Sequence, residues 1–124
     1  MNAETNGRGA LAVATLIGTA LQLAMVVTGH FVPAVAAMFA IGGMAISGIA
    51  GFVYARRAGT TRGGSIGGGA LAGGLCALIG IAVSWLLGDV AAIILVFGTL
   101  SSAVTGAIGG WIGHAVGKRA LARA

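Results

Sequence analysis

Four polar side chains stand out in a chain of 124 residues that is otherwise mostly apolar. These candidate pore or solute contacts are Gln22, His30, Asp89 and His114. A carboxylate attracts cations, an imidazole exchanges protons near neutral pH, and an amide both donates and accepts hydrogen bonds. Gln22 is the most central of them within an apolar segment, and an amide in lipid needs a partner on another helix. These residue types indicate contact with an ion or solute rather than bond-breaking chemistry.

Asp89 has two interpretations. Beside Gly88 it marks the start of the last apolar segment, where a carboxylate accepts free backbone N–H groups and favours the helix dipole. Alternatively, it attracts cations next to His30, if the chain brings the two turns together, and the pair then responds to pH. His114 is expected to reach headgroups or water at the opposite interface. We expect no metal site, because structural zinc usually takes four protein ligands.

Sequence patterns of enzymes are missing. There is no HExxH motif, and no serine stands with a placed base. The glycine-rich segment 63–69 lacks the GxxxxGK[ST] pattern of a phosphate-binding loop, so we interpret it as a flexible loop. The single cysteine, Cys76, is expected to pack as a small apolar residue. We therefore predict a protein that is not an enzyme and has no cofactor. Four hydroxyls are expected to bond to their own helix backbones: these are Ser84, Ser101, Ser102 and Thr105.

The composition indicates which kind of structure positions these polar groups. Apolar residues make up 58% of the chain and charged residues 7%, and the mean hydropathy is +1.05. Soluble domains carry about 25% charged residues. Residues 9–55 contain no Lys, Arg, Asp or Glu, and residues 63–117 contain only Asp89. Since a helix needs roughly 20 apolar residues to cross a bilayer, we predict an all-α integral membrane protein with four transmembrane helices.

The predicted helices form two hairpins. The spans are residues 10–28, 34–55, 65–87 and 90–116, so that the first hairpin covers 10–55 and the second 65–117. A basic loop, residues 56–64, joins the hairpins, and two tails, residues 1–9 and 118–124, flank them. Pro33 and Gly88 signal the turns inside the hairpins.

The basic residues predict the orientation. All seven lie in the tails and the middle loop, which share one side of the membrane if there are four spans. The positive-inside rule then makes both termini cytoplasmic. We expect a multi-pass protein of a bacterial inner membrane, with anionic lipid headgroups near its basic side. The net charge of +5 follows from this arrangement, so we do not expect binding to nucleic acid.

The two halves resemble each other. Residues 7–12 (GRGALA) match residues 67–72 (GGGALA), and residues 45–48 (AISG) match residues 103–106 (AVTG). Each half ends in a basic pair, at residues 56–57 and 118–119. We interpret this as a parallel internal repeat of the hairpin, although a composition rich in glycine and alanine also produces such matches.

Small residues recur at intervals of three or four along the predicted spans, which places them on one helix face. The predicted packing positions are Gly43, Ser47, Gly51, Gly69, Gly73, Gly106, Gly110 and Gly113. Such faces allow helices in lipid to approach closely. We expect the last three spans to form the tight centre, and surplus small faces to make a homo-oligomer. The favoured function is a small channel or transporter for ions or small solutes. The alternative is an accessory or assembly subunit of a larger membrane complex.

Overall fold

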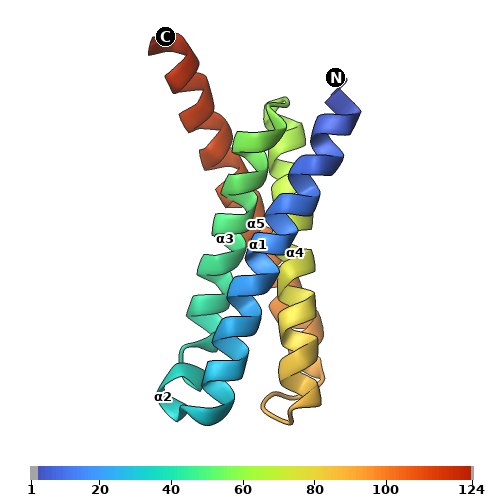
Figure 1. The fold of residues 1–124 in the computed structure, drawn as a ribbon, viewed down its shortest axis with the longest axis vertical. Helices are drawn as coiled ribbons and strands as arrows, with labels where there is room; N and C mark the ends of the chain where they lie inside the picture. Colours follow the sequence, from blue (N-terminus) through green and yellow to red (C-terminus); the bar gives the residue numbers. More distant parts are fainter. Residues whose placement is uncertain (1–2, 124) are drawn as a thin grey trace.

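The computed structural model describes residues 3–123, which form α-helices and no β-strand (Figure 1). Four helices are long: α1 (Ala3–Phe31), α3 (Phe39–Ala58), α4 (Arg62–Leu86) and α5 (Ile93–Arg123). A short helix, α2 (Pro33–Ala36), lies between α1 and α3. The start of α1, the α3–α4 connection and the end of α5 lie at one end of the bundle. We call this the basic end, and the end that contains α2 the α2 end.

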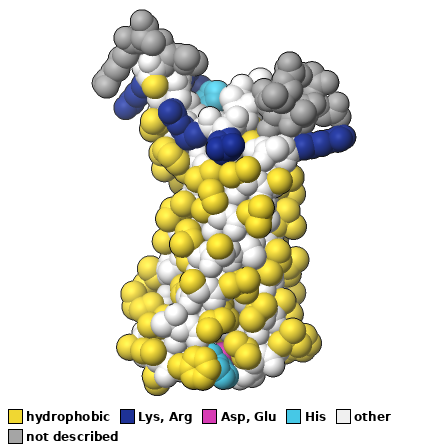
Figure 2. Space-filling view, viewed as in Figure 1, with side chains coloured by type: hydrophobic (Ala, Val, Ile, Leu, Met, Phe, Trp, Pro, Cys, Tyr) yellow, Lys and Arg dark blue, Asp and Glu magenta, His cyan; other side chains and the backbone are white. Residues whose placement is uncertain are grey.

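Each long helix contains a segment that is long and apolar enough to cross a membrane. These segments are Gly7–Phe31, Phe39–Ala58, Arg62–Leu86 and Ile93–Ala120. Large apolar side chains such as Leu16 and Leu86 are exposed on the outside of the bundle. Figure 2 shows apolar side chains along the sides of the molecule, with Lys and Arg gathered at the basic end. The prediction of an all-helical, multi-pass membrane protein with four apolar spans is confirmed.

At the basic end, the helices are longer than the sequence predicts. The expected loop of residues 56–64 shrinks to residues 59–61, because α3 ends at Ala58 and α4 starts at Arg62. Gly59 ends α3 with a φ of 58°, and the Thr61 hydroxyl accepts a hydrogen bond of 3.1 Å from the Gly64 N–H to cap α4. Segment 63–69 is helical rather than a flexible loop. In lipid, a helix is the conformation that satisfies every backbone polar group, so glycine does not interrupt it.

At the α2 end, the connections are longer than predicted. Helix α1 continues to Phe31, and α3 starts at Phe39 instead of residue 34. Helix α5 starts at Ile93 instead of residue 90, which leaves residues 87–92 as its connection to α4. Gly88 turns the chain there with a φ of 81°.

Glycines bring the backbones of α3, α4 and α5 into contact in the half nearer the basic end. A Cβ atom added to Gly51 or to Gly69 would overlap the carbonyl oxygen of Gly106, which stands between α3 and α4. A Cβ atom on Gly73 would lie 2.8 Å from the carbonyl oxygen of Ser102 and 3.0 Å from the carbonyl oxygen of Ser47. No side chain fits between these three helices, so lipid is excluded from the crossing.

The other predicted packing positions fall into three kinds of contact. Gly110 stands against the Ser65 carbonyl, and a Cβ atom on Gly113 would lie 2.8 Å from the Phe52 oxygen. Ser47 is fully buried. Gly43 faces a side chain instead of a backbone, since a Cβ atom there would lie 3.6 Å from Gln22 Oε1. Gly109 stands against the Gly48 carbonyl and tightens the contact between α3 and α5.

Helix α1 lies across α3 and α4 and makes no comparable contact with α5. Its buried residues follow a spacing of four, and of three at the end, which places them on one face: they are Ala10, Ala14, Gly18, Gln22, Val26 and Gly29. At Gly18 the approach is close, since an added Cβ atom would lie 2.8 Å from Cys76 Sγ on α4. Among the buried residues of this face, Gln22 alone has a strongly polar side chain.

Candidate functional site

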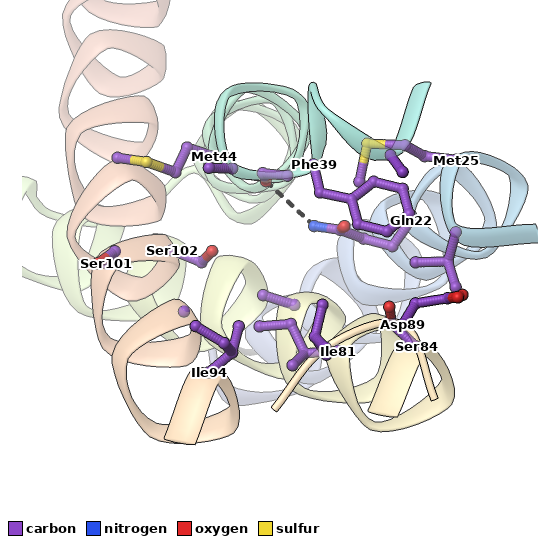
Figure 3. A pocket seen from close by; sticks show the side chains of 18 of the residues that line it. Gln22, Met25, Phe39, Met44, Ile81, Ser84, Asp89, Ile94, Ser101 and Ser102 are labelled. Carbon is purple, nitrogen blue, oxygen red and sulfur yellow. Dashed lines mark hydrogen bonds between the residues drawn. The ribbon is translucent and has the colours of Figure 1, made fainter. Parts of the chain in front are cut away.

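A cavity of about 440 Å³ lies between α1, α3, α4 and α5 in the half of the bundle nearer the α2 end (Figure 3). It extends from Gln22 and Gly43 to Asp89 and Val90 in the α4–α5 connection. Towards the α2 end, the pair α1 and α3 lies apart from the pair α4 and α5 (Figure 1), and residues of all four helices line the cavity. Its volume falls in the range of sites for small molecules, which starts at roughly 300 Å³.

Gln22 forms the inner end of this cavity. The side chain is 2% exposed, and its Nε2 atom donates to the Gly43 carbonyl at 3.1 Å and to the Ser47 hydroxyl at 3.4 Å. The expectation that this amide bonds to another helix is confirmed, since both acceptors lie on α3. The hydrogen bonds among the described residues use only the nitrogen of the amide, and its oxygen remains available as an acceptor.

Ser47 extends this network to α4. Its hydroxyl accepts from Gln22 and donates to the Gly73 carbonyl at 3.1 Å. The Cys76 thiol donates to the same carbonyl at 3.3 Å. Hydrogen bonds therefore join α1, α3 and α4 at one level of the bundle. On one side of this level lies the cavity, and on the other the backbones cross at Gly106.

Ser84 lines the cavity one turn of α4 beyond Gly80. It is 2% exposed, and its Oγ atom has no hydrogen-bond partner among the described residues. The expectation that Ser84 bonds to its own helix backbone is therefore wrong, whereas Thr105 does so, donating to the Ser102 carbonyl at 3.0 Å. A buried hydroxyl without a partner is costly, and Ser84 stands in the wall of the cavity.

His30 and Asp89 form a pair at the α2 end. The Nδ1 atom of His30 lies 2.9 Å and 3.1 Å from the two carboxylate oxygens of Asp89. The two side chains are partly exposed, at 34% and 23%. Asp89 also lines the cavity. The interpretation of Asp89 as the cap of the last span is wrong, because α5 starts only at Ile93 and the carboxylate bonds to His30 instead.

His114 lies apart from the other three candidates. It is on α5 near the basic end, where its Nδ1 atom lies 3.4 Å from the buried Ser65 hydroxyl. The structure thus places Gln22 and Asp89 in one cavity, with His30 bonded to Asp89, and leaves His114 out. No group of three or more His, Cys, Asp or Glu side chains gathers within the described part of the chain.

The sequence interpretation missed most of the cavity wall. That wall is largely apolar, and Met25, Phe39, Ile81 and Ile94 contribute to it (Figure 3). One signal was present in α4: the small residues Gly69, Gly73, Gly80 and Ser84 lie along neighbouring rows of the helix surface. Near the basic end they face other backbones, and near the α2 end they face the cavity.

No protein-family model, curated protein or solved structure matches this chain. Its functional interpretation therefore depends on the cavity and its polar groups.

Proposed function

We propose that this protein transports a small solute across the membrane and that the cavity between α1, α3, α4 and α5 is its solute site. The observation that carries the proposal is a cavity of about 440 Å³ whose wall includes Ser84, a buried residue with no partner for its hydroxyl among the described residues. The free oxygen of the Gln22 amide stands at its inner end. A bundle that only fills a membrane has no use for a cavity of this size.

The packing favours a carrier over an open channel. Beyond the network of Gln22 and Ser47, the backbones of α3, α4 and α5 meet at Gly51, Gly69 and Gly106. A continuous path through a single chain would have to separate these backbones. A site that is accessible from one side and closed toward the other is the arrangement expected of alternating access.

The orientation in this proposal follows the positive-inside rule. We infer a bacterial inner membrane, with the basic end and both termini in the cytoplasm and the cavity toward the outer side. The arginines at the basic end, including Arg56 and Arg57, would then contact anionic lipid headgroups. Labelling of single cysteines at Thr60 and at the exposed Leu87 in intact cells tests this, using a background in which Cys76 is replaced. Only the residue 87 position is expected to react with a membrane-impermeant maleimide.

Pairing into two hairpins and their duplication also belong to the proposal. Contacts of α1 with α3 and of α4 with α5 support the hairpins, and those of α1 with α4 and of α3 with α5 agree with a parallel repeat. The repeat is not followed everywhere, since the contact of α3 with α4 has no equally extensive counterpart between α1 and α5.

We further propose a homo-oligomer, as the glycine content suggests. The packing restricts which surfaces it can use, since Gly69, Gly73, Gly106 and Gly110 are occupied by contacts within the chain. Cross-linking of the protein in native membranes measures the number of copies. A chain found only within a larger assembly would instead support the accessory subunit.

The transport proposal is tested with purified protein in liposomes. Uptake of small solutes is measured for the wild type, for Gln22→Leu and for Ser84→Ala. Thr105→Val serves as the matched control, because its hydroxyl bonds within α5 and does not line the cavity. We expect uptake by the wild type and the control and reduced uptake by the two cavity variants. Absence of uptake of every solute, or equal uptake by all variants, would contradict the proposal.

A further inference from the structure

The polar groups of the cavity share one property: each is able to accept a hydrogen bond from a ligand. They are the Gln22 oxygen, the Ser84 hydroxyl and the Asp89 carboxylate, which come from α1, α4 and the α4–α5 connection. From this arrangement we propose that the cavity binds a small organic amine, whose ammonium group is held at the α2 end by Asp89 and the neighbouring Ser84 and whose apolar body extends along the cavity wall. This inference rests on the proposed solute site and specifies the class of its ligand.

The Gln22 amide presents only one of its two ends. Its nitrogen donates to Gly43 and Ser47 on α3. Those bonds hold the amide in place, so that it offers a fixed oxygen and no free donor. A ligand that is long enough to reach the inner end of the cavity can therefore bond to Gln22 through an N–H or O–H group.

Ser84 offers the second acceptor. Because the side chain is 2% exposed and its oxygen has no partner among the described residues, nothing in the surrounding protein competes with a ligand for it. Gly80 provides the room beside it: a Cβ atom there would lie 2.8 Å from the Cβ atom of Gln22. Without side-chain atoms at Gly80, Gln22 reaches across the face of α4 that also carries Ser84.

Asp89 determines the sign of the charge. It is the only acidic residue of the chain outside the N-terminal segment, and no lysine or arginine among the described residues lines the cavity. A carboxylate repels anions, and its hydrogen bonds with cationic donors are stronger than those between neutral groups. His30 already contacts both carboxylate oxygens, so an ammonium group would share Asp89 with the imidazole or replace it.

The rest of the wall selects the body of the ligand. Met25, Phe39, Ile81, Ile94 and Phe97 leave apolar surface along most of the cavity. Removing apolar surface from water lowers the free energy. The cavity therefore favours a ligand with an apolar body over strongly hydrated cations such as simple metal ions. The combination of acceptors, one carboxylate and apolar walls fits an amine with a short hydrocarbon chain or a single ring.

The experiment compares three probes with the same body: 2-phenylethylamine, 2-phenylethanol and 3-phenylpropionate. Binding to the full-length protein in detergent micelles is measured by calorimetry, with protein-free micelles subtracted. We expect the amine to bind roughly tenfold more tightly than the alcohol, and the carboxylate to bind least. Equal binding of amine and alcohol, or preference for the carboxylate, would overturn the proposal, and so would binding no stronger than to protein-free micelles.

Variants identify the contacts. Asp89→Asn is expected to reduce amine affinity to that of the alcohol, and Ser84→Ala to weaken both probes several-fold. Thr105→Val, outside the cavity, is the matched control, and thermal unfolding shows whether each variant is folded. If Asp89→Asn does not fold, Ser84→Ala and the comparison of the three probes still test whether the cavity binds the amine. Unchanged binding in the folded variants would place the amine elsewhere and reject the site.

Failure of this inference and failure of the transport proposal give different results. If liposomes take up a neutral solute through Ser84 and Gln22 but no amine binds, the ligand class is wrong and transport remains. If the amine binds in the cavity but no solute crosses liposomes, the site is a binding site and transport is wrong.

Discussion

A matched pair of substitutions in α4 tests the glycine packing that closes the inner half of the bundle. Gly67 and Gly69 lie on opposite faces of the same helix turn. A Cβ atom on Gly67 meets nothing within 4 Å, whereas a Cβ atom on Gly69 would overlap the Gly106 carbonyl and lie 3.0 Å from the Gly110 Cα atom. Gly67→Ala and Gly69→Ala therefore add the same methyl group to open space and to a helix contact.

The expected magnitude follows from these contacts. Both variants gain helix propensity, worth up to about 1 kcal/mol for Gly→Ala in a helix. At Gly69 both neighbours are backbone atoms, which cannot rotate away as a side chain would. Helices α4 and α5 must separate by about 0.5–1 Å, and a gap of that size removes a quarter to a half of the dispersion energy between facing atoms. Overpacking of this kind costs about 1–3 kcal/mol.

The assay is reversible unfolding in mixed micelles with increasing SDS, followed by helix content. We expect Gly67→Ala to be as stable as the wild type or slightly more stable. Gly69→Ala should fall about 2 kcal/mol below Gly67→Ala, which is roughly a 30-fold change in the unfolding equilibrium constant. Equal stability of the two variants would refute the claim that α4 and α5 touch through their backbones at this position.

Three further predictions use the same unfolding assay or the amine titration. Ser47→Ala removes the hydroxyl between the Gln22 amide and the Gly73 carbonyl, and we expect a loss of about 0.5–1.5 kcal/mol in unfolding free energy; an unchanged midpoint would contradict the network. Gly18→Ala should destabilise, because its Cβ atom would lie 2.8 Å from Cys76 Sγ. Adding Cys76→Gly to Gly18→Ala should restore about 1 kcal/mol, whereas additive losses would argue against that contact. His30→Ala leaves both Asp89 oxygens free, so amine affinity should rise several-fold, and a fall would show that His30 contacts the ligand itself.

The sequence predicted the features that depend on composition and on the needs of single polar groups. Apolar segments separated by basic clusters predicted four spans. The rule that an amide in lipid needs a partner predicted the bond of Gln22 to another helix, which Gly43 and Ser47 accept. The close contacts at Gly69 and Gly106 agree with the spacing of small residues, because helices without side chains at a crossing can approach.

What the sequence did not predict depends on helix geometry. A row of small residues looks the same in the sequence whether it packs against another helix or lines a cavity. The sequence therefore did not indicate that Gly80 and Ser84 line a cavity. The distinction comes from the angle at which α1 and α3 leave α4 and α5. Asp89 had two interpretations for a related reason: the local pattern suited a helix cap, which is wrong, whereas the alternative, pairing with His30, depended on bringing together two turns that are distant in the sequence.

Gln22 connects the two halves of the bundle, and this affects how its variants should be interpreted. Its aliphatic part packs against Gly80 on α4, while its amide binds Gly43 and Ser47 on α3. The side chain thus both separates the helices around the cavity and presents an acceptor to it. Gln22→Leu changes packing and chemistry together, so its effect on transport does not by itself identify a ligand contact. Ser84→Ala removes one buried oxygen that bonds to nothing in the described protein. Its stability should therefore match or exceed that of the wild type, so any loss of binding or transport in this variant reports on the ligand.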